Sequence, residues 1–413
     1  MIQKAKGTQD YFAKEAQILK LTLNKLEKVA LAYNFAFVKT PIFENINLFK
    51  RAVGEESDIV NKEMFELVAK NNKDHFVLRP EGTAPIVRMV LENKLTELGK
   101  KQRLYYEGVM FRYEQPQKGR QREFFQFGVE LLNDSSLLAD LEVLLLGKQI
   151  LDEFKIKKYQ LRLNCIGTLD SRKTYLKALK KYYLLNKDKL SIDSLTRLDN
   201  NVLRILDSKD SADILINNNA PSIIDYLDKK EQDTFNTLCD ELKKLKVSFI
   251  IDNKLVRGLD YYNGLVFEFV STEEKVLGAK DTIIGGGRYD HLIAQFDSKK
   301  DVPAVGFALG ISRLILVAID NLKKELIINN NYYVMSTSFE FTSFALEVAT
   351  KLRAKNFQVE LDCSLQKFEK KMRKAIKNNY KQLIIVGKET LAGEVIIKNL
   401  QTEEQKTIKL NSL

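Results

Sequence analysis

Apolar residues in the first hundred positions recur with spacings that change from helical to strand-like and back. Residues 13–33 carry them every three or four positions, which is typical of one face of a helix. The next segment, FAFVKTPIFE, predicts a strand interrupted by Pro41, a residue that a sheet tolerates at an edge. Residues 75–95 predict a strand, a tight turn and a helix, with Thr83 as a candidate N-cap and Pro85 early in the helix.

Residues 104–114 and 123–132 predict the two strands of a hairpin. Because alternate side chains share a face of a strand, Arg112 lies with Glu114, and Gln126 lies with Glu130. Such a polar face is either solvated, as on many antiparallel sheets, or approached by a ligand. Glycine and methionine at neighbouring positions of the same faces favour a surface that a ligand approaches.

The loop of this hairpin is basic, and Arg112 lies at its base. Its cations form either an ordinary solvated charge run or a phosphate clamp, to which arginine brings planar bidentate contacts. They are Lys118, Arg120 and Arg122.

The pattern changes twice in the second half of the chain. After a helix predicted over 137–155, the segment 165–250 has no glycine between Gly167 and Gly258 and is rich in Lys, Asp and Asn, which predicts an inserted helical layer at about 168–250. Strand patterning returns near 255 and continues to the strand and helix of AVGFALGISRLILVAIDNL. Strands then alternate with helices, which predicts a small α/β domain at 329–413 after a first domain at 1–325.

The charge and composition of the chain favour some classes of partner over others. The 413 residues include 66 Lys and Arg against 55 Asp and Glu, a formal charge of +11. This excess favours nucleic acid as a partner, although a base-biased genome gives a similar Lys-rich composition. No apolar run approaches the ~18–20 residues that span a bilayer, and the N-terminus lacks a signal-peptide core. We therefore expect a cytoplasmic protein with no membrane partner.

Few residues are available for cysteine, histidine or metal chemistry. Cys165, Cys239 and Cys363 have neither disulfide nor zinc-ligand spacing, and His75 and His291 are the only histidines. Neither a P-loop nor a G-x-G-x-x-G fingerprint precedes a helix. The chemistry must therefore rest on arginine, carboxylates, amides and tyrosine.

The segment LVRGLDYYNGLVFEFV (255–270) places polar groups at the mouth of an apolar strand. These groups are Arg257, Asp260, Tyr261 and Tyr262. Further on, GGGRYD (285–290) is either a flexible turn or a place where the backbone approaches a ligand closely. Arg313 falls in the first turns of a helix, where a cation gains nothing from the helix dipole. It is held either by a surface salt bridge or by a nucleotide phosphate or base.

Together and in this order, these segments resemble the class II aminoacyl-tRNA synthetases, and within them the histidyl-tRNA synthetases. FAFVKTPIFE resembles motif 1, YYEGVMFRYEQPQKGRQREFFQFGVELL resembles motif 2, and AVGFALGISRL resembles motif 3. The histidine-specific resemblance lies in LVRGLDYYNGLVFE and GGGRYD, with support from KGTQD, LRPEGT and RLDNNVLRILDSKD. It covers nearly the whole chain.

The resemblance implies a fold and a reaction. The fold is an α+β catalytic domain on a mixed, mainly antiparallel sheet with a helical insertion, followed by a small α/β anticodon-binding domain. The reaction is ATP-dependent attachment of L-histidine to its tRNA through a histidyl-adenylate. Mg²⁺ would accompany ATP as a co-substrate, with no tightly bound cofactor. A homodimer with Pro41 at its interface is also implied.

The resemblance also implies site residues. Those for histidine are Glu81, Thr83, Arg112, Gln126, Glu130, Arg257, Tyr261 and Tyr262. Those for ATP are Arg112, Glu114, Arg120 and Arg313, and the catalytic cations are Arg257 and Arg112. An imidazole has two ring nitrogens, and a site that hydrogen-bonds both rejects analogues by ~10⁴–10⁵. Glu130 with Tyr262 suits this role, while Glu81 and Gln126 suit the substrate ammonium group.

The chain departs from the family pattern at Lys6, Ser312 and His291, where Arg, Glu and Gly are usual, and FDSKKDVPAVG lacks a glycine pair. None of these changes removes an expected ligand, but Lys6 and Ser312 leave local contacts to tRNA or ATP open. Two alternatives share the core: a non-catalytic regulatory subunit of ATP phosphoribosyltransferase, and an RNA-binding sensor of uncharged tRNA. The retained arginines and the C-terminal domain favour the active ligase.

Overall fold

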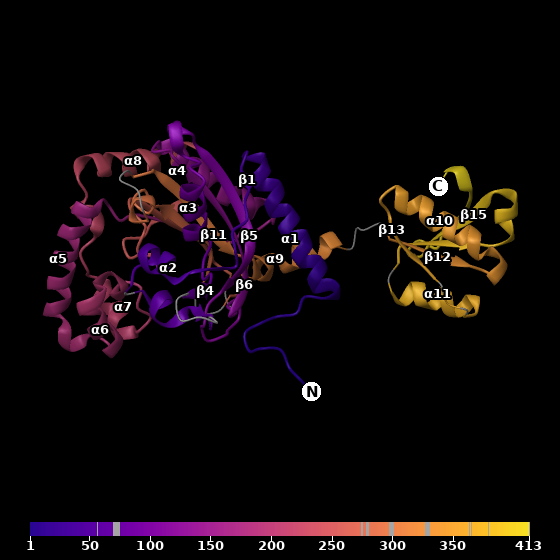
Figure 1. Ribbon diagram of the computed structural model, residues 1–413, viewed down its shortest axis with the longest axis horizontal. Coiled ribbons are helices and arrows are strands. Elements are labelled where there is room, and N and C mark those ends of the chain that lie inside the picture. The colour runs from indigo at the N-terminus through magenta and orange to yellow at the C-terminus, as the bar shows by residue number, and fades with distance from the viewer. Residues whose placement is uncertain are drawn as a thin grey trace. The chain divides into compact units, whose positions relative to one another are not determined.

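A computed structural model gives the structure of the protein, which divides into two compact units (Figure 1). The N-terminal unit spans Met1–Lys323 and the C-terminal unit spans Lys324–Leu413. The structure describes residues 1–55, 57–68, 75–273, 276–277, 281–296, 301–326, 331–362, 364, 366–378 and 380–412.

An eight-stranded sheet forms the centre of the N-terminal unit. The strand order is β1-β5-β6-β11-β10-β9-β7-β8, in which the edge strands β1 and β8 pair parallel and all other neighbours pair antiparallel. The sheet confirms the predicted mixed, mainly antiparallel architecture. Its strands are β1 (Ala36–Phe37), β5 (Gln102–Phe111), β6 (Glu123–Leu132), β7 (Tyr159–Cys165), β8 (Phe249–Ile251), β9 (Leu265–Ser271), β10 (Thr282–Arg288) and β11 (Ala304–Gly310).

Helices cover the two faces of this sheet differently. On one face α4 (Leu137–Glu153) packs on β6, β10 and β11, and α1 (Ala13–Ala32) packs on α4. Phe269 of β9 lies against Gly147 of α4, so the preceding residue, Glu268, points to the opposite face. There α2 (Ile46–Val53) and α3 (Thr83–Glu92) pack together and share a core with Tyr106, Tyr261 and Tyr262.

The segment around Pro41 divides into two strands, as its interrupted pattern predicted. β1 pairs only at the edge of the large sheet, while β2 (Phe43–Asn45) enters a second, three-stranded sheet. In that sheet β4 (Phe76–Leu78) lies between β2 and β3 (Phe65–Glu66). The chain then turns from β4 into α3.

Glu81, and not Thr83, caps the N-terminus of α3. The Glu81 carboxylate accepts hydrogen bonds from the backbone N–H groups of Thr83, at 2.7 Å, and Ala84, at 2.8 Å. These bonds satisfy two donors that a helix N-terminus leaves free. The N-cap position is Gly82. The prediction that Thr83 caps the helix is wrong, because its hydroxyl donates to another carboxylate.

The three glycines of GGGRYD lie inside β10, so a flexible turn is the wrong alternative for them. A Cβ at Gly285 would lie 2.4 Å from the guanidinium nitrogens of Arg257, and one at Gly286 would lie 2.2 Å from the carbonyl oxygen of Gly306. The glycines therefore permit a close approach of the protein's own groups. The last residue of β10 is Arg288, which forms a salt bridge with Asp140 of α4 at 2.8 Å.

Four helices follow β7 where the glycine-free segment predicted a helical layer. They are α5 (Leu169–Leu185), α6 (Ile192–Asn200), α7 (Ser211–Asn217) and α8 (Lys229–Lys244). Side chains of Thr168, Ser191, Asp210 and Asp228 cap their N-termini, which is the position that these residue types favour. These helices, with the turns between them, are called the insertion below (residues 166–248).

The C-terminal unit contains a five-stranded mixed sheet in the order β13-β12-β14-β15-β16. β12, β13 and β14 are parallel, as the alternating pattern predicted, and β15 and β16 add an antiparallel hairpin that the pattern did not identify. Separate apolar clusters with α10 and α11 cover its two faces. The elements are β12 (Asn331–Ser336), α10 (Thr342–Ala354), β13 (Gln358–Leu361), α11 (Phe368–Lys377), β14 (Gln382–Val386), β15 (Glu394–Asn399) and β16 (Gln405–Lys409).

Two further findings bear on composition. Among the described helices, none combines the length and apolar character that crossing a bilayer requires. Cys165 and Cys239 are buried free thiols, and Cys363 lies outside the described residues.

Candidate functional site

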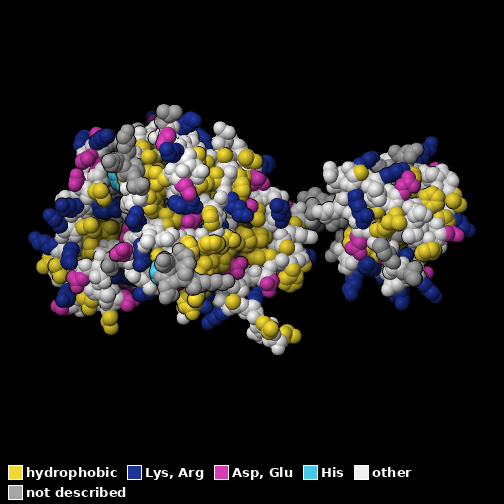
Figure 2. All heavy atoms as spheres, in the orientation of Figure 1, with side chains coloured by type: hydrophobic (Ala, Val, Ile, Leu, Met, Phe, Trp, Pro, Cys, Tyr) yellow, Lys and Arg dark blue, Asp and Glu magenta, His cyan; other side chains and the backbone are white. Residues whose placement is uncertain are grey.

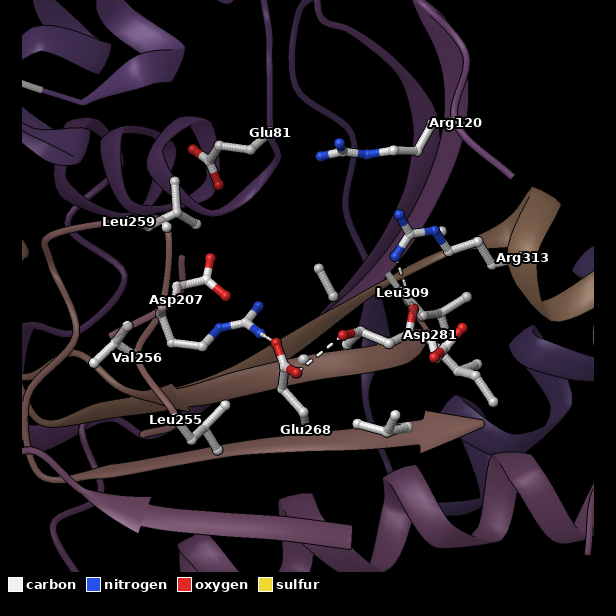
Figure 3. Close-up of a pocket in the computed structure, with 18 of the residues that line it drawn as sticks. Glu81, Arg120, Asp207, Leu255, Val256, Leu259, Glu268, Asp281, Leu309 and Arg313 are labelled. Atoms are coloured by element: carbon white, nitrogen blue, oxygen red, sulfur yellow. Dashed lines mark hydrogen bonds and ion pairs between the residues drawn. The ribbon is translucent and has the colours of Figure 1, made fainter. Parts of the chain in front are cut away.

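A cavity of about 560 Å³ opens on the sheet face opposite α4. Its lining includes ten of the eleven site residues that were predicted from the sequence. The eleventh, Glu130, is buried beside Thr83. The ten come from five separate segments: Glu81, Thr83, Arg112, Glu114, Arg120, Gln126, Arg257, Tyr261, Tyr262 and Arg313. Figure 3 shows Glu81 on one side of this cavity and Arg120 and Arg313 on the other.

The end of the cavity with carboxyl, amide and tyrosine groups is built around Glu130, which is 1% exposed. Thr83 donates its hydroxyl to one carboxylate oxygen at 2.7 Å, and the phenol of Tyr289 donates to the other. Burial raises the pKa of Glu130 to about 8, although these two hydrogen bonds lower it. The group is therefore poised to carry or release a proton near neutral pH. A solvated face for this strand, one of the two predicted alternatives, is wrong.

Gln126 is the neighbouring polar group on β6. Its amide nitrogen donates to the phenol of Tyr106 at 3.0 Å. Its Oε1 is buried and has no hydrogen-bond partner within the described parts of the chain. A buried acceptor left free is costly, so this oxygen marks a place for a donor from a ligand.

Three tyrosine rings close this end of the cavity. The ring centroids of Tyr261 and Tyr262 lie 4.6 Å apart, and the Tyr289 ring meets them edge-on at 5.7 and 6.5 Å. Burial raises the pKa of all three phenols, which therefore stay protonated as donors. The arrangement is apolar in body and offers hydroxyl groups at its edge.

Arg257 enters the cavity from the loop before β9 and is fixed by Glu268. The two form a close ion pair, and Thr282 donates its hydroxyl to the other oxygen of Glu268 at 2.9 Å (Figure 3). The Arg257 guanidinium also lies 5.7 Å from the centre of the Tyr262 ring. Although burial lowers the pKa of Arg257, Glu268 and the tyrosines raise it, so the cation is permanent. Its Nε is buried and lacks a partner among the described residues.

Arg112 lies directly beyond β5, which ends at Phe111. Its Nε donates to the carbonyl oxygen of Pro80 at 2.9 Å, and its guanidinium lies 5.5 Å from the Phe124 ring centre. Glu114 accepts two bonds from Arg120, at 2.8 and 3.1 Å, and stands 4.0 Å from Arg112. The two arginines are therefore held by one carboxylate on the cationic side of the cavity.

Arg313, in the first turn of α9 (Ile311–Leu326), donates to the carbonyl oxygens of Thr282, at 2.9 Å, and Gly119, at 3.3 Å. It forms no salt bridge within the described ranges, so the surface-salt-bridge alternative is wrong. Burial and then the nearby charge of Arg120 lower its pKa. A cation placed beside another cation at a helix N-terminus calls for an anionic ligand.

The hairpin cations separate in the structure. Arg120 lines the cavity, whereas the Arg122 guanidinium stacks 3.9 Å from the Tyr113 ring centre and bonds the carbonyl oxygen of Glu114. Lys118 is not among the lining residues. At the positions that depart from the family pattern, Lys6 is exposed, His291 Nδ1 lies 2.8 Å from Asp301, and Ser312 lines the cavity.

Three groups of the site were not identified from the sequence as site residues: Tyr106, Glu268 and Tyr289. Each had a local signal, because Glu268 is the only charged residue of β9 and the tyrosines stand in segments already singled out. The insertion also supplies one wall of the cavity; its segment RLDNNVLRILDSKD carried a family resemblance, but no site role was assigned to it from the sequence. Its contributions include Asp207, Ser208, Lys209 and Ile214.

Comparison with known proteins agrees with this geometry. A family model described as histidyl-tRNA synthetase matches residues 7–314, and one described as an anticodon binding domain matches residues 326–413. The chloroplastic histidine–tRNA ligase of Pyropia yezoensis is 40% identical over 100% of this chain and 95% of its own length. The histidine–tRNA ligase of Lactobacillus johnsonii is 40% identical over 99% of this chain and 96% of its own length.

Two solved structures share the fold of this chain. The apo histidyl-tRNA synthetase of S. aureus aligns with a TM-score of 0.82 and 30% identity, over 100% of this chain and 98% of that one. A Bacillus halodurans structure described as an ATP phosphoribosyltransferase regulatory subunit/histidyl-tRNA synthetase shares the fold, with a TM-score of 0.66 and 24% identity over 94% of this chain and 98% of that one. The family models, the two relatives and the S. aureus structure together show that the chain belongs to the histidyl-tRNA synthetase family.

Proposed function

We propose that this chain joins L-histidine to its tRNA in two steps and that both occur in the cavity described above. The ligase reaction follows from the family to which the chain belongs. It also follows from relatives that are named histidine–tRNA ligases and that match this chain over nearly their full length. The observation that carries the residue-level proposal is the division of one cavity into an acid–amide–tyrosine end and a cationic end. An amino acid and a nucleotide need those two environments side by side.

The amino acid occupies the end formed by Glu130 and the tyrosines. Glu130 and Tyr262 engage the two imidazole nitrogens, Thr83 and Tyr261 complete the pocket, and the ammonium group bonds Glu81 and the free Oε1 of Gln126. In this pocket the pKa of Glu130, about 8 when empty, falls once a donor ring occupies it. Such a site favours histidine because an analogue lacking a ring N–H leaves buried groups unpaired.

The nucleotide occupies the cationic end. Arg112 and Arg257 bracket the α-phosphate, while Glu114, Arg120 and Arg313 hold the rest of ATP. A carboxylate oxygen of histidine attacks the α-phosphorus, pyrophosphate leaves, and the two arginines stabilise the added charge. The terminal ribose hydroxyl of tRNA then attacks the histidyl carbonyl carbon, and AMP leaves.

Mg²⁺ enters this scheme with ATP, as the co-substrate complex. Phosphate oxygens are the ligands that Mg²⁺ prefers, usually with one or two protein carboxylates and several waters. The cavity carboxylates Glu114 and Glu268 are the ones closest to the arginines that would hold the phosphates.

A homodimer through the segment around Pro41 is part of the proposal. Large apolar side chains near this segment are exposed: Phe37 at 51%, Ile42 at 44% and Phe43 at 51%. Figure 2 shows hydrophobic side chains gathering over the part of the N-terminal unit where β4, β5 and β6 lie. Exposed apolar patches of this kind are typical of protein interfaces. Gel filtration with light scattering at micromolar protein checks this state.

The C-terminal unit binds tRNA, and its basic helix α11 is the candidate contact. Figure 2 shows Lys and Arg side chains projecting from the edge of this unit where α11 lies. Lys371 is excluded from that surface, because it is buried and donates to the carbonyl oxygen of Ser336 at 3.4 Å. The remaining cations are Lys367, Lys370, Arg373, Lys374 and Lys377. We place the reaction in the cytoplasm, where buried free thiols such as Cys165 stay reduced.

Histidine-dependent ATP–pyrophosphate exchange tests the ligase. The purified protein should exchange label only when both histidine and Mg-ATP are present. Absence of exchange at saturating substrates would instead favour the regulatory-subunit or tRNA-sensor alternatives, neither of which needs the phosphate-facing Arg257.

A further inference from the structure

Tyr106 is a buried tyrosine of β5 to which the proposed reaction gives no role. It is 3% exposed and packs in the core shared with Tyr261 and Tyr262. It is not among the residues that line the cavity, so it does not touch a ligand there. Its hydroxyl oxygen instead accepts a hydrogen bond at 3.0 Å from the side-chain amide of Gln126, which does line the cavity.

The register of β5 and β6 places the Tyr106 ring between two polar groups. Tyr106 stands opposite Gly128, and Gln126 and Glu130 lie two residues to either side of that glycine. Residues two apart share a face of a strand, so the three side chains lie together on one face. A Cβ at Gly128 would lie 2.4 Å from the phenol oxygen. The glycine therefore makes the room in which the ring lies across β6.

A second glycine holds the same ring from the other side. A Cβ at Gly82, in the turn before α3, would lie 2.2 Å from a ring carbon of Tyr106 and 2.8 Å from its hydroxyl oxygen. With backbone so near on two sides, the phenol oxygen has little freedom to move. Burial, and then the charges of Glu130 and Glu81, raise the pKa of Tyr106, so the hydroxyl stays protonated.

The fixed phenol oxygen determines which end of the Gln126 amide faces the cavity. Nε2 of a glutamine only donates hydrogen bonds, and Oε1 only accepts them. Because Tyr106 holds Nε2, the end left over is Oε1, which is buried and which no group in the described part of the chain bonds. The reverse orientation would turn N–H donors toward the ligand. An ammonium group, which also has only donors, would then be repelled.

Glu81 is the other group proposed for the ammonium, and its orientation is set in a different way. Its carboxylate lies at the same cavity (Figure 3) and accepts hydrogen bonds from the backbone N–H groups of Thr83 and Ala84 at 2.7 and 2.8 Å. Both of its oxygens are acceptors, so a rotation does not change what it offers. Gln126 is thus the group of this pair whose effect on the ligand depends on its orientation.

We propose that Tyr106 is a positioning residue that fixes the Gln126 amide with Oε1 toward the cavity and thereby makes the site select ligands with an α-ammonium group. The inference deepens the proposed function and rests on the place given there to the ammonium group of histidine. A site discriminates most strongly where a missing ligand group leaves a buried polar atom unpaired. Tyr106 prepares such an atom, because it leaves Oε1 of Gln126 buried and free.

The test compares the binding of two ligands to the full-length protein by titration calorimetry. One is L-histidine, and the other is 3-(imidazol-4-yl)propanoate, which keeps the imidazole and the carboxylate and lacks only the ammonium group. Tyr106→Phe should raise the Kd of histidine by about 10- to 100-fold, the range expected for a hydrogen bond to a charged group. It should change the Kd of the propanoate by no more than about twofold, since that ligand has no donor for Oε1.

The matched control is Tyr105→Phe at the neighbouring position of β5. Tyr105 is 2% exposed, and its side chain lies on the opposite face of the strand, where the hydroxyl group donates to Glu27 at 3.0 Å. The control therefore removes the same atom and one hydrogen bond from a buried ring. Its Kd for both ligands should equal that of the wild type. Thermal unfolding shows whether each variant is folded at the temperature of the titration.

A double variant shows whether Tyr106 acts through Gln126. Once Gln126→Leu has removed the amide, Tyr106→Phe should have no further effect, so the Kd of histidine for the double variant should match that for Gln126→Leu within about twofold. The double variant replaces both partners of the hydrogen bond by apolar groups and leaves neither unpaired. It therefore also serves if Tyr106→Phe alone does not fold.

Three results overturn the inference. They are a Kd of histidine for Tyr106→Phe within about twofold of the wild type, an equal weakening of both ligands, and a double variant that binds histidine at least about tenfold more weakly than Gln126→Leu. A wild type that binds histidine but shows no pyrophosphate exchange overturns the proposed reaction alone, because the binding comparison still tests Tyr106. A wild type that does not bind histidine overturns both.

Discussion

At the scale of single residues, Glu130 shows how burial and hydrogen bonding oppose each other. Burial raises its pKa to about 8, although two hydroxyl groups donate hydrogen bonds to its two carboxylate oxygens and thereby lower the pKa. Near neutral pH the empty pocket therefore holds a proton that the unfolded chain has lost, since an ordinary Glu titrates near 4.5. A folded-state pKa above the unfolded one gives stability at low pH that is lost as pH rises.

This direction of the change of stability with pH leads to a prediction for Glu130→Gln, which introduces an uncharged side chain of nearly the same shape. The stability of wild type minus that of the variant should fall as pH rises from about 4.5 to about 8, by at most about 1.4 kcal/mol per pH unit. Urea unfolding midpoints from pH 5 to pH 9 measure this difference. A difference that does not change with pH would mean that Glu130 titrates as an ordinary carboxyl group.

Arg257 carries the second prediction at this scale. Arg257→Ala should lower the rate of adenylate formation by roughly 10²–10³-fold, because a fixed cation at the phosphate is lost, while histidine binding changes little. Exchange kinetics and a histidine titration measure the two quantities separately. Arg103→Ala removes an arginine that pairs with Glu142 at 2.7 Å and is not a cavity residue, and it should keep the wild-type rate. Lost binding with an unchanged rate constant would contradict the catalytic role.

At the scale of elements, β10 serves the core on one face and the cavity on the other. Gly285 stands against the Arg257 guanidinium, whereas Gly286 stands against the backbone of β11. Because successive residues of a strand point to opposite faces, adjacent glycines lie against different parts of the protein. The absence of a Cβ at Gly285 leaves the room that Arg257 needs to reach Glu268.

The two glycines make a matched pair of substitutions. Gly285→Ala puts a Cβ 2.4 Å from the flexible end of Arg257, so exchange activity should fall at least about tenfold with stability changed by less than about 1 kcal/mol. Gly286→Ala puts a Cβ 2.2 Å from the Gly306 carbonyl oxygen, which cannot rotate away, so stability should fall by about 1–3 kcal/mol. Urea unfolding and exchange kinetics on both variants check this division. Equal losses of stability in the two would contradict it.

At the scale of the whole molecule, the two units have separate cores and separate sheets. The cavity lies wholly in the N-terminal unit, so the first chemical step needs nothing from the other. In the proposed function, recognition of tRNA draws also on the basic helix α11 of the C-terminal unit.

Removal of residues 324–413 should therefore abolish tRNA charging and leave adenylate formation within about an order of magnitude of wild type. Charging of tRNA and pyrophosphate exchange measure the two steps on the same preparation. Light scattering on the shortened protein separates loss of tRNA binding from loss of the dimer. Equal loss of both steps in a protein that remains dimeric would contradict the separation.

Much of the fold followed from local patterns. The helical stripe over 13–33, the hairpin strands and the alternating C-terminal elements were correct, because the period of apolar residues reports which face of an element is buried. The hairpin β15–β16 was not identified, since β16 is largely exposed and has little apolar alternation. The cap of α3 was misassigned because Thr83 had a stronger partner elsewhere in the chain.

The sequence alone determined most of the elements, the fold class and the family, since these depend on periodicity and on short motifs. Only the tertiary structure decided which distant side chains contact each other. It paired Glu130 with Tyr289, 159 residues away, placed Glu268 on Arg257, and brought Arg172 of the insertion to the carbonyl oxygen of Tyr262 in the loop before β9. Such pairings depend on strand order and register, which bring distant segments together and which no local pattern encodes.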